Sequence, residues 1–411
     1  MLDITDEIKQ LYNLDSVNKT LILEFYEKKT DNVAMLTLSN ENIISESMVL
    51  NESICDSETL EFGSVFASKF EIDLFNIDAD LMGFYLKVYM VISNTEYKMP
   101  LFNGKVESSK LQNNRRKRHI IAYDDVYNVL DTDITDWYVG LANSYSTQVY
   151  TIKNFREMLL DYLGLEYEEK SLINDDFLLF IQTAKTGLTA RSLLHDVCEI
   201  NGCFGRLNRN NIFIFKEIKK LDYHYPSDSL YPIQSLYPGV YISPNDIYTI
   251  DEYINIEYGE YRTKPITKLE IYDSQTGNDA NLVGEFDNWY NYPTPLSNPN
   301  LYPSDDIYPG YINDLNSYVI SDNICVDSGE FTNQMAQQVF NAINGYSYIP
   351  IDLSLRGLPY VEVGDVINII LDDEGTSITT IILSRNLTGI QALKDEFISK
   401  GDEYHNEEYK I

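Results

Sequence analysis

The sequence is poor in the residues that most often carry catalysis or bind metals. Among 411 residues there are two tryptophans, four histidines (His119, His195, His224 and His405) and four cysteines (Cys55, Cys198, Cys203 and Cys325). The cysteines lack metal-ligand spacing, and the chain contains no Walker A, HExxH, GxSxG or EF-hand motif. We therefore predict no metal, no cofactor and no catalytic residue, and expect four reduced, mostly buried cysteines.

Basic residues are also scarce. There are 31 lysines and arginines against 64 aspartates and glutamates, which gives a formal net charge of −33. Such a charge argues against a protein that holds DNA by its phosphates. Two interpretations stay open, of which the simpler is solubility. The sharper one is an acidic channel wall along which DNA slides without sticking.

Long apolar runs are absent as well. No segment approaches the roughly 20 apolar residues of a membrane-spanning helix, so no membrane anchor is expected. The start, MLDITDEIKQLYNLDS, is acidic and has no apolar core, which argues against a secretory signal. With 44% hydrophobic residues the chain is globular, and its length predicts two to four domains.

From Thr20 to about Ala122 the pattern predicts short β-strands. TLILEFYEK, AMLTLSN, KFEIDLFNI, FYLKVYMVI and HIIAYDD alternate apolar and polar residues, which is typical of a barrel or sandwich. In KFEIDLFNI the residues Phe70, Ile72, Leu74 and Asn76 share the face expected to be buried. Gly63 permits a turn.

Between about 126 and 215 the period becomes helical. FREMLLDYLGLEY predicts one helix that stops at Gly164, with Phe155, Met158, Leu159 and Leu163 on its apolar stripe. A second helix should follow Thr189 as N-cap and end at Asn201-Gly202, with Leu193, Leu194, Val197 and Ile200 inward. CFGRLNRNNIFIFKEI then predicts a hairpin that turns at 208–211 and puts Phe213 and Phe215 on one face.

The stretch 223–311 contains six Tyr-Pro pairs, at 225–226, 231–232, 237–238, 292–293, 302–303 and 308–309. Proline removes amide donors, so these pairs indicate loops, which are either ordered surface loops or an interface. YINIEYGEY and TKLEIYDS predict strands between them. A helix in EFTNQMAQQVFNAINGY should then precede IDLSLR and a pair formed by VINIIL and TTIILSRNLTG, and LKDEFISKGDEYHNEEYKI is expected to be a polar tail.

Three clusters are candidate sites. His195 and Cys198 are three residues apart on a predicted helix, which allows a catalytic pair, although a structural role fits the surrounding packing stripe better. The acidic groups Asp175-Asp176, Asp305-Asp306 and Asp372-Asp373-Glu374 could bind Ca²⁺ but fit solvated turns better. The run Arg115-Arg116-Lys117-Arg118 fits an exposed loop or a subunit salt-bridge patch, or a contact with an acidic partner or nucleic acid.

Four segments together resemble the tail-hub proteins of tailed bacteriophages, a family similar to the baseplate hub and to the N-terminal part of tail-associated lysins. They are residues 46–74, 118–138, 192–215 and 346–403, which span almost the whole chain. The resemblance implies an α+β, mainly β fold with two β-barrel-like hub domains, an inserted α+β module and the Tyr/Pro-rich region. The expected boundaries are 1–125 for the first barrel-like domain, 126–216 for the module, 217–345 for the Tyr/Pro-rich region with part of the second β domain, 346–396 for the closing strands and 397–411 for the tail.

The same resemblance implies a homotrimeric virion protein that is assembled in the host cytoplasm and has no enzymatic activity. It would close the tail tube at the tail tip, or baseplate, and adapt a sixfold tube to a threefold tip. Its expected partners are the distal tail protein or tube hexamer, the tape-measure protein and tail fibre or tip proteins, with DNA only in transit. Many relatives carry a lytic or receptor-binding domain after the hub, for which the chain leaves no room after about Glu403. The alternative function is a cell-wall-degrading or carbohydrate-binding tail component.

Overall fold

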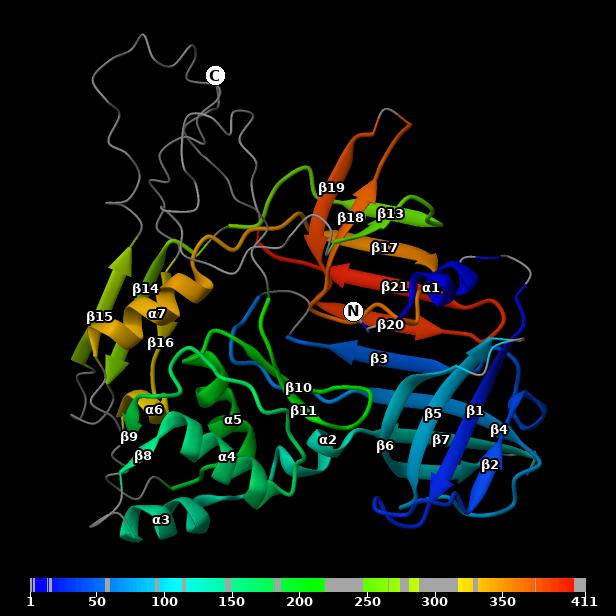
Figure 1. Ribbon diagram of the computed structural model, residues 1–411, viewed down its shortest axis with the longest axis horizontal. Helices are drawn as coiled ribbons and strands as arrows, with labels where there is room; N and C mark the ends of the chain where they lie inside the picture. The colour runs from blue at the N-terminus through cyan, green and yellow to red at the C-terminus, as the bar shows by residue number, and fades with distance from the viewer. Residues whose placement is uncertain are drawn as a thin grey trace.

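The computed structural model describes residues 2–402 except 3, 13, 15–16, 56–59, 93–94, 96, 113–115, 145–148, 180, 182–185, 219–246, 265, 274–280, 288–316, 328–331 and 374. The fold is mainly β with a helical module beside it, which confirms the α+β class (Figure 1). Its largest element is one antiparallel sheet of eleven strands, in the order β13-β17-β21-β20-β3-β4-β7-β6-β5-β1-β2.

The N-terminal half of this sheet matches the predicted strands. Its members are β1 (Lys19–Tyr26), β2 (Leu36–Leu38), β3 (Val49–Ser53), β4 (Lys69–Phe75), β5 (Tyr85–Ile92), β6 (Lys98–Leu111) and β7 (Lys117–Tyr123). Alternate residues are buried along β1, β4 and β5, as the period of two requires. Asn76 is a correction: the strand ends at Phe75, and Asn76 lies exposed outside it with a φ of 55°.

The predicted barrel does not close in the part of the chain that the structure describes. The eleven strands form an open sheet, in which β2 and β13 are the two edges. A short 3₁₀ turn (Asn40–Asn42) after β2 nevertheless brings Ile43 into a single bridge with Leu74 of β4. The Asn40 side chain also donates to the Lys19 carbonyl and accepts from the Leu21 amide, which extends the pairing along β1. The N-terminal strands from β4 to β2 thus curl until the segment after β2 reaches β4, which buries one face of these strands.

The C-terminal strands continue the same sheet. They are β13 (Asn255–Tyr258), β17 (Ile351–Arg356), β20 (Ser384–Thr388) and β21 (Lys394–Ser399), and β20 pairs directly with β3. A separate three-stranded sheet is formed by β12 (Tyr248–Ile250), β18 (Val366–Ile370) and β19 (Ser377–Ile381).

Two expectations for these strands were wrong. TTIILSRNLTG is two strands, β19 and β20, because the chain leaves the small sheet after Ile381 and joins the large one. LKDEFIS is the strand β21, with Asp395, Phe397 and Ser399 buried, because its alternate residues face the core. α1 (Asp6–Tyr12) lies near this half, where the Tyr12 ring meets Tyr360 edge-on (Figure 1).

The predicted α+β module follows β7. It comprises α2 (Asp125–Val129), α3 (Thr135–Ser144), β8 (Tyr150–Thr151), α4 (Ile152–Leu163), β9 (Leu178–Leu179), α5 (Ala190–Glu199) and the hairpin β10 (Phe204–Leu207) and β11 (Phe213–Lys216). Thr189 caps α5 and Gly164 ends α4 with a left-handed φ of 67°, as predicted. On α4 the fully buried stripe contains Phe155 and Leu159, but Met158 and Leu163 are only half-buried.

A third unit packs beside the module. The strands β14 (Lys268–Asp273), β15 (Asn281–Asp287) and β16 (Ser317–Ile320) form a mixed sheet with α6 (Ile324–Asp327) and α7 (Asn333–Ile343) nearby (Figure 1). Met335, Val339 and Ile343 of α7 are buried, as its apolar stripe predicts. The six Tyr-Pro pairs, Asp305-Asp306, His224 and His405 lie outside the described residues.

Candidate functional site: a buried arginine–carboxylate cluster

The most concentrated charges in the interior surround Glu52 of β3. Its carboxylate accepts hydrogen bonds from Arg206 at 2.9 Å, Arg385 at 3.1 Å and Arg209 at 3.5 Å. Each of these four side chains is at least 96% buried. Glu52 is in phase with the buried Leu50, so the alternation of the strand itself turns the carboxylate inward.

The three arginines come from two distant parts of the chain. Arg206 lies in β10 and Arg209 in the turn that follows it, whereas Arg385 lies in β20 beside β3. Arg385 also holds Asp395 of β21, with Nε–Oδ1 and Nη2–Oδ2 distances of 2.7 and 3.0 Å. This two-pronged contact is the strong geometry for an arginine and a carboxylate. The cluster therefore joins the module hairpin to the centre of the large sheet.

Further N–H groups of two of these arginines bind backbone carbonyls of the loop between β17 and β18. Arg385 donates to the carbonyls of Leu358 and Val361, and Arg209 donates to those of Pro359 and Val361. Backbone carbonyls in an irregular loop would otherwise be buried without partners, which is costly. The cluster thus also stabilises the loop 358–361.

The charges of the cluster nearly balance. Arg206, Arg209 and Arg385 face the carboxylates of Glu52, Asp395 and the nearby Glu362. Burial alone would raise the pKa of Glu52, but the three arginines outweigh it and lower that pKa to about 2. Glu52 therefore stays ionised across the physiological range. A carboxylate fixed in this way is an anchor rather than a proton-transferring group.

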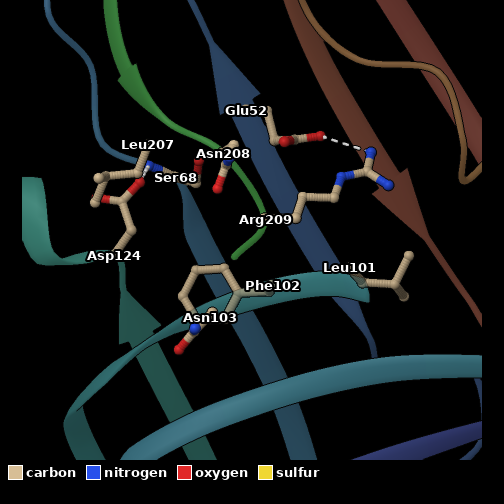
Figure 2. A pocket seen from close by; sticks show the side chains of 9 residues that line it. All are labelled: Glu52, Ser68, Leu101, Phe102, Asn103, Asp124, Leu207, Asn208 and Arg209. Carbon is tan, nitrogen blue, oxygen red and sulfur yellow. Dashed lines mark hydrogen bonds and ion pairs between the residues drawn. The ribbon is translucent and has the colours of Figure 1, made fainter. Parts of the chain in front are cut away.

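A small cavity lies beside the cluster. Figure 2 shows Arg209 reaching from the hairpin toward Glu52, with Asp124 at the end of β7 on the opposite side. The cavity measures about 10 Å³, which is space for about one water molecule and too little for an organic substrate. Burial raises the pKa of Asp124 to about 7, although its Oδ2 accepts from the Ser68 amide at 2.7 Å.

A second buried acid, Glu199 of α5, joins the module to the third unit. Its carboxylate accepts from Asn323 Nδ2 at 2.9 Å and from the Tyr318 hydroxyl at 3.2 Å. Desolvation raises its pKa to about 7, despite the neighbouring His195. The aromatic rings of Phe62 and Tyr318 meet edge-on next to it.

The surroundings of His195 and Cys198 do not favour a catalytic pair. Burial alone would lower the pKa of His195, but the neighbouring Asp196 and Glu199 carboxylates favour its charged form and raise that pKa. Cys198 is fully buried near Cys203, and burial raises the pKa of its thiol well above the usual range. A thiol held neutral is a poor nucleophile, so these positions support packing rather than catalysis. All four cysteines are free and buried, as predicted.

Some of the charged residues that the sequence analysis expected at the surface are buried, and others lie in turns as expected. Asp175 was expected in a solvated turn, but it is buried and binds Arg156 with both oxygens at 2.8 Å. Asp372 does accept from the Thr376 amide in the turn between β18 and β19. Of the basic run, Arg118 is buried and donates to backbone carbonyls, including that of Ile77, and Lys117 pairs with Asp73 at 2.5 Å. Arg115 lies outside the described residues.

Sequence reasoning missed the arginine cluster itself. The alternation of the strands does indicate that Glu52 and Arg385 point inward. Glu52 lies two residues from the buried Leu50, and Arg385 lies two residues from the buried Leu387. A charged residue at an inward position predicts a buried partner of opposite charge. Which partner that is depends on pairing across more than 300 residues. Among the described residues, no group of histidines, cysteines and carboxylates is arranged to hold a metal ion, and no helix is long and apolar enough to cross a membrane.

No protein-family model and no curated protein sequence matches the chain. Among solved structures, it is similar over nearly its full length to tail proteins of phages and prophages. One is the 43 kDa tail protein of prophage MuSo2 from Shewanella oneidensis, with 8% identity, 93% of this chain and 97% of that chain covered, and a TM-score of 0.48. The tail protein from Neisseria meningitidis MC58 has 11% identity, coverages of 94% and 97%, and a TM-score of 0.49. Prophage tail protein gp18 from Listeria monocytogenes EGD-e has 11% identity, coverages of 93% and 95%, and a TM-score of 0.47.

Proposed function

We propose that this chain is a structural hub protein of a tail tip, in a phage or a related tail-like particle. The observation that supports this proposal is that the four segments that resemble tail-hub proteins all contribute residues to the Glu52 cluster or to the cavity beside it. Residues 46–74 supply Glu52, 118–138 supply Asp124, 192–215 supply Arg206 and Arg209, and 346–403 supply Arg385 and Asp395. Segments that are far apart in the sequence are thus joined by one buried cluster, and we propose that this cluster serves to hold the fold rigid.

The two halves of the large sheet are the candidates for the two barrel-like hub domains. One half is the curled set β1, β2 and β4–β7, and the other contains β13, β17, β20 and β21, with β3 between them. Three copies of a chain with two similar halves would present six similar surfaces to a sixfold tube and three to the tip. The role needs binding surfaces rather than a reaction, and the Glu52 cluster would keep the two halves in a fixed relation.

The charge of the chain supports passage of DNA rather than its retention. A trimer would carry three times −33, or −99, around one axis. Phosphates crossing such a ring would be repelled by its wall, so that the genome and the tape-measure protein before it would not adhere.

The test is the mass of the purified chain by light scattering, alone and with the tail protein encoded immediately upstream. We expect a mass near three times 47.4 kDa that grows into a complex with a sixfold ring. A stable monomer that does not bind the upstream tail protein would contradict the proposal. Zymography on host cell walls tests the alternative, because a structural hub produces no clearing whereas a cell-wall hydrolase does.

A further inference from the structure

One face of the N-terminal half-sheet is rich in lysine. It contains Lys69, Lys87, Lys98, Lys105, Lys110 and Lys117, and we refer to it as the lysine face. These side chains point away from the buried residues of their strands, and the register puts Tyr85, Lys105, Tyr123 and Lys69 in one row. Helices α3–α7 lie away from these strands (Figure 1).

The lysine face carries a positive balance in a very acidic chain. Its four carboxylates, Glu24, Glu71, Asp73 and Glu107, each lie within 4.0 Å of a lysine nitrogen. Six lysines against four carboxylates give +2, which leaves −35 on the remainder of the chain. Lys87 lies over the Tyr26 ring at 4.9 Å, and Lys110 is exposed. Neither has a carboxylate within ion-pair distance among the described residues.

The opposite balance occurs on the α+β module. Apart from Arg156, which is paired with the buried Asp175, the helices α3 and α4 contain three carboxylates, Asp136, Glu157 and Asp161, and one lysine, Lys153, which gives −2. We call the exposed part of α3 and α4 the acidic module face. It also exposes half of the Tyr162 side chain, stacked on Trp137 with ring centroids 5.3 Å apart. Aromatic rings are enriched at protein interfaces.

We infer that the acidic module face of one copy docks on the lysine face of the next copy of this chain. The inference rests on the trimer proposed above and names its contact surfaces. Because the two faces differ, the contact is head-to-tail, and such contacts generate closed rings when the rotation per copy allows it. A second copy is the inferred occupant, because the chain itself carries an acidic face complementary in charge to the lysine face.

Charge reversal tests the inference on the full-length chain. Lys87→Glu with Lys110→Glu reverses the lysine face without breaking an internal ion pair, and Asp136→Lys with Asp161→Lys reverses the module face. Each pair should weaken self-association by about tenfold or more in sedimentation at low salt. All four substitutions together should restore it. The control, Lys400→Glu, makes the same reversal at an exposed position just after the C-terminal strand β21 and should leave association unchanged, in contrast to Lys110→Glu alone.

The outcomes separate this inference from the proposed function. If the wild-type chain is a trimer and neither reversed pair weakens it, the docking assignment is wrong while the hub proposal stands. If the wild-type chain is a monomer, the hub proposal itself fails. If reversal of the lysine face leaves the trimer intact but abolishes binding of a fluorescent single-stranded oligonucleotide, the face serves nucleic acid and the inference is overturned. Restoration by the fourfold variant would also exclude misfolding as the cause of the loss.

Discussion

Substitution of Glu52 by glutamine should destabilise the protein strongly although it preserves the shape of the side chain. It leaves three buried arginines facing two carboxylates, and breaking a buried ion pair in this way costs about 3–5 kcal/mol. The pKa gives a similar magnitude. A shift from 4.5 to about 2 corresponds to about 3 kcal/mol of stability at neutral pH.

The sign of the pH dependence follows from the lowered pKa of Glu52. Its contribution is complete above about pH 4.5, where the carboxylate is ionised in both states, and it is lost as the pH falls toward 2. The difference between wild type and Glu52→Gln should therefore shrink to roughly half by pH 3.

Urea denaturation followed by far-UV circular dichroism at pH 7 and pH 3 measures this difference. Glu71→Gln is the matched control, because Glu71 pairs with Lys69 at 2.5 Å on a half-exposed face and should contribute less than about 1 kcal/mol. If Glu52→Gln lost no more stability than Glu71→Gln, the role given to the cluster would be refuted. So would a difference that did not change with pH.

Four further predictions concern other parts of the fold. Gly104→Ala should cost about 2 kcal/mol or more in urea denaturation, since its Cβ would collide with the Tyr123 carbonyl, whereas Gly140→Ala in α3 meets open space and should be neutral or stabilising. Burial raises the pKa of Asp124 from 3.8 to about 7, so the wild-type protein loses stability as the pH rises between these values. The stability of Asp124→Asn relative to wild type should therefore increase by about 2–3 kcal/mol between pH 5 and pH 8. A relative stability that does not change with pH would contradict the burial argument. Asp175→Asn should lose about 3 kcal/mol in thermal or urea unfolding because Arg156 stays charged and buried, and a loss below 1 kcal/mol would mean that water reaches the arginine. The four cysteines should resist a water-soluble thiol reagent in the native state and all react in guanidinium; rapid labelling of the native protein would show that the core opens.

Local features of the fold could be predicted from the sequence because they depend on neighbouring residues. The capping of α5 by Thr189, the end of α4 at Gly164 and the alternation of β1 and β4 are of this kind. The division of TTIILSRNLTG into two strands of different sheets was not predictable, since both halves have the same period and only tertiary pairing separates them.

The buried charges were missed for a related reason. Arg118 and Asp175 stand in charged segments, which suggests exposure, and each is buried because a partner from elsewhere in the fold binds it. Composition reveals the charge of such a residue but not its partner. Strand phase indicates the inward direction, and the identity of the partner requires the three-dimensional pairing.

The position of β3 determines when the protein can finish folding during its synthesis. One edge of β3 pairs with β4, about 20 residues later, but the other pairs with β20, more than 330 residues later. At about 5–20 residues per second, a ribosome needs roughly 20–70 s to make the missing strand. Throughout that interval the nascent chain presents an open strand edge, and Glu52 lacks its partner Arg385. Synthesis of this protein at high concentration should therefore depend on chaperones, and its truncated fragments should aggregate.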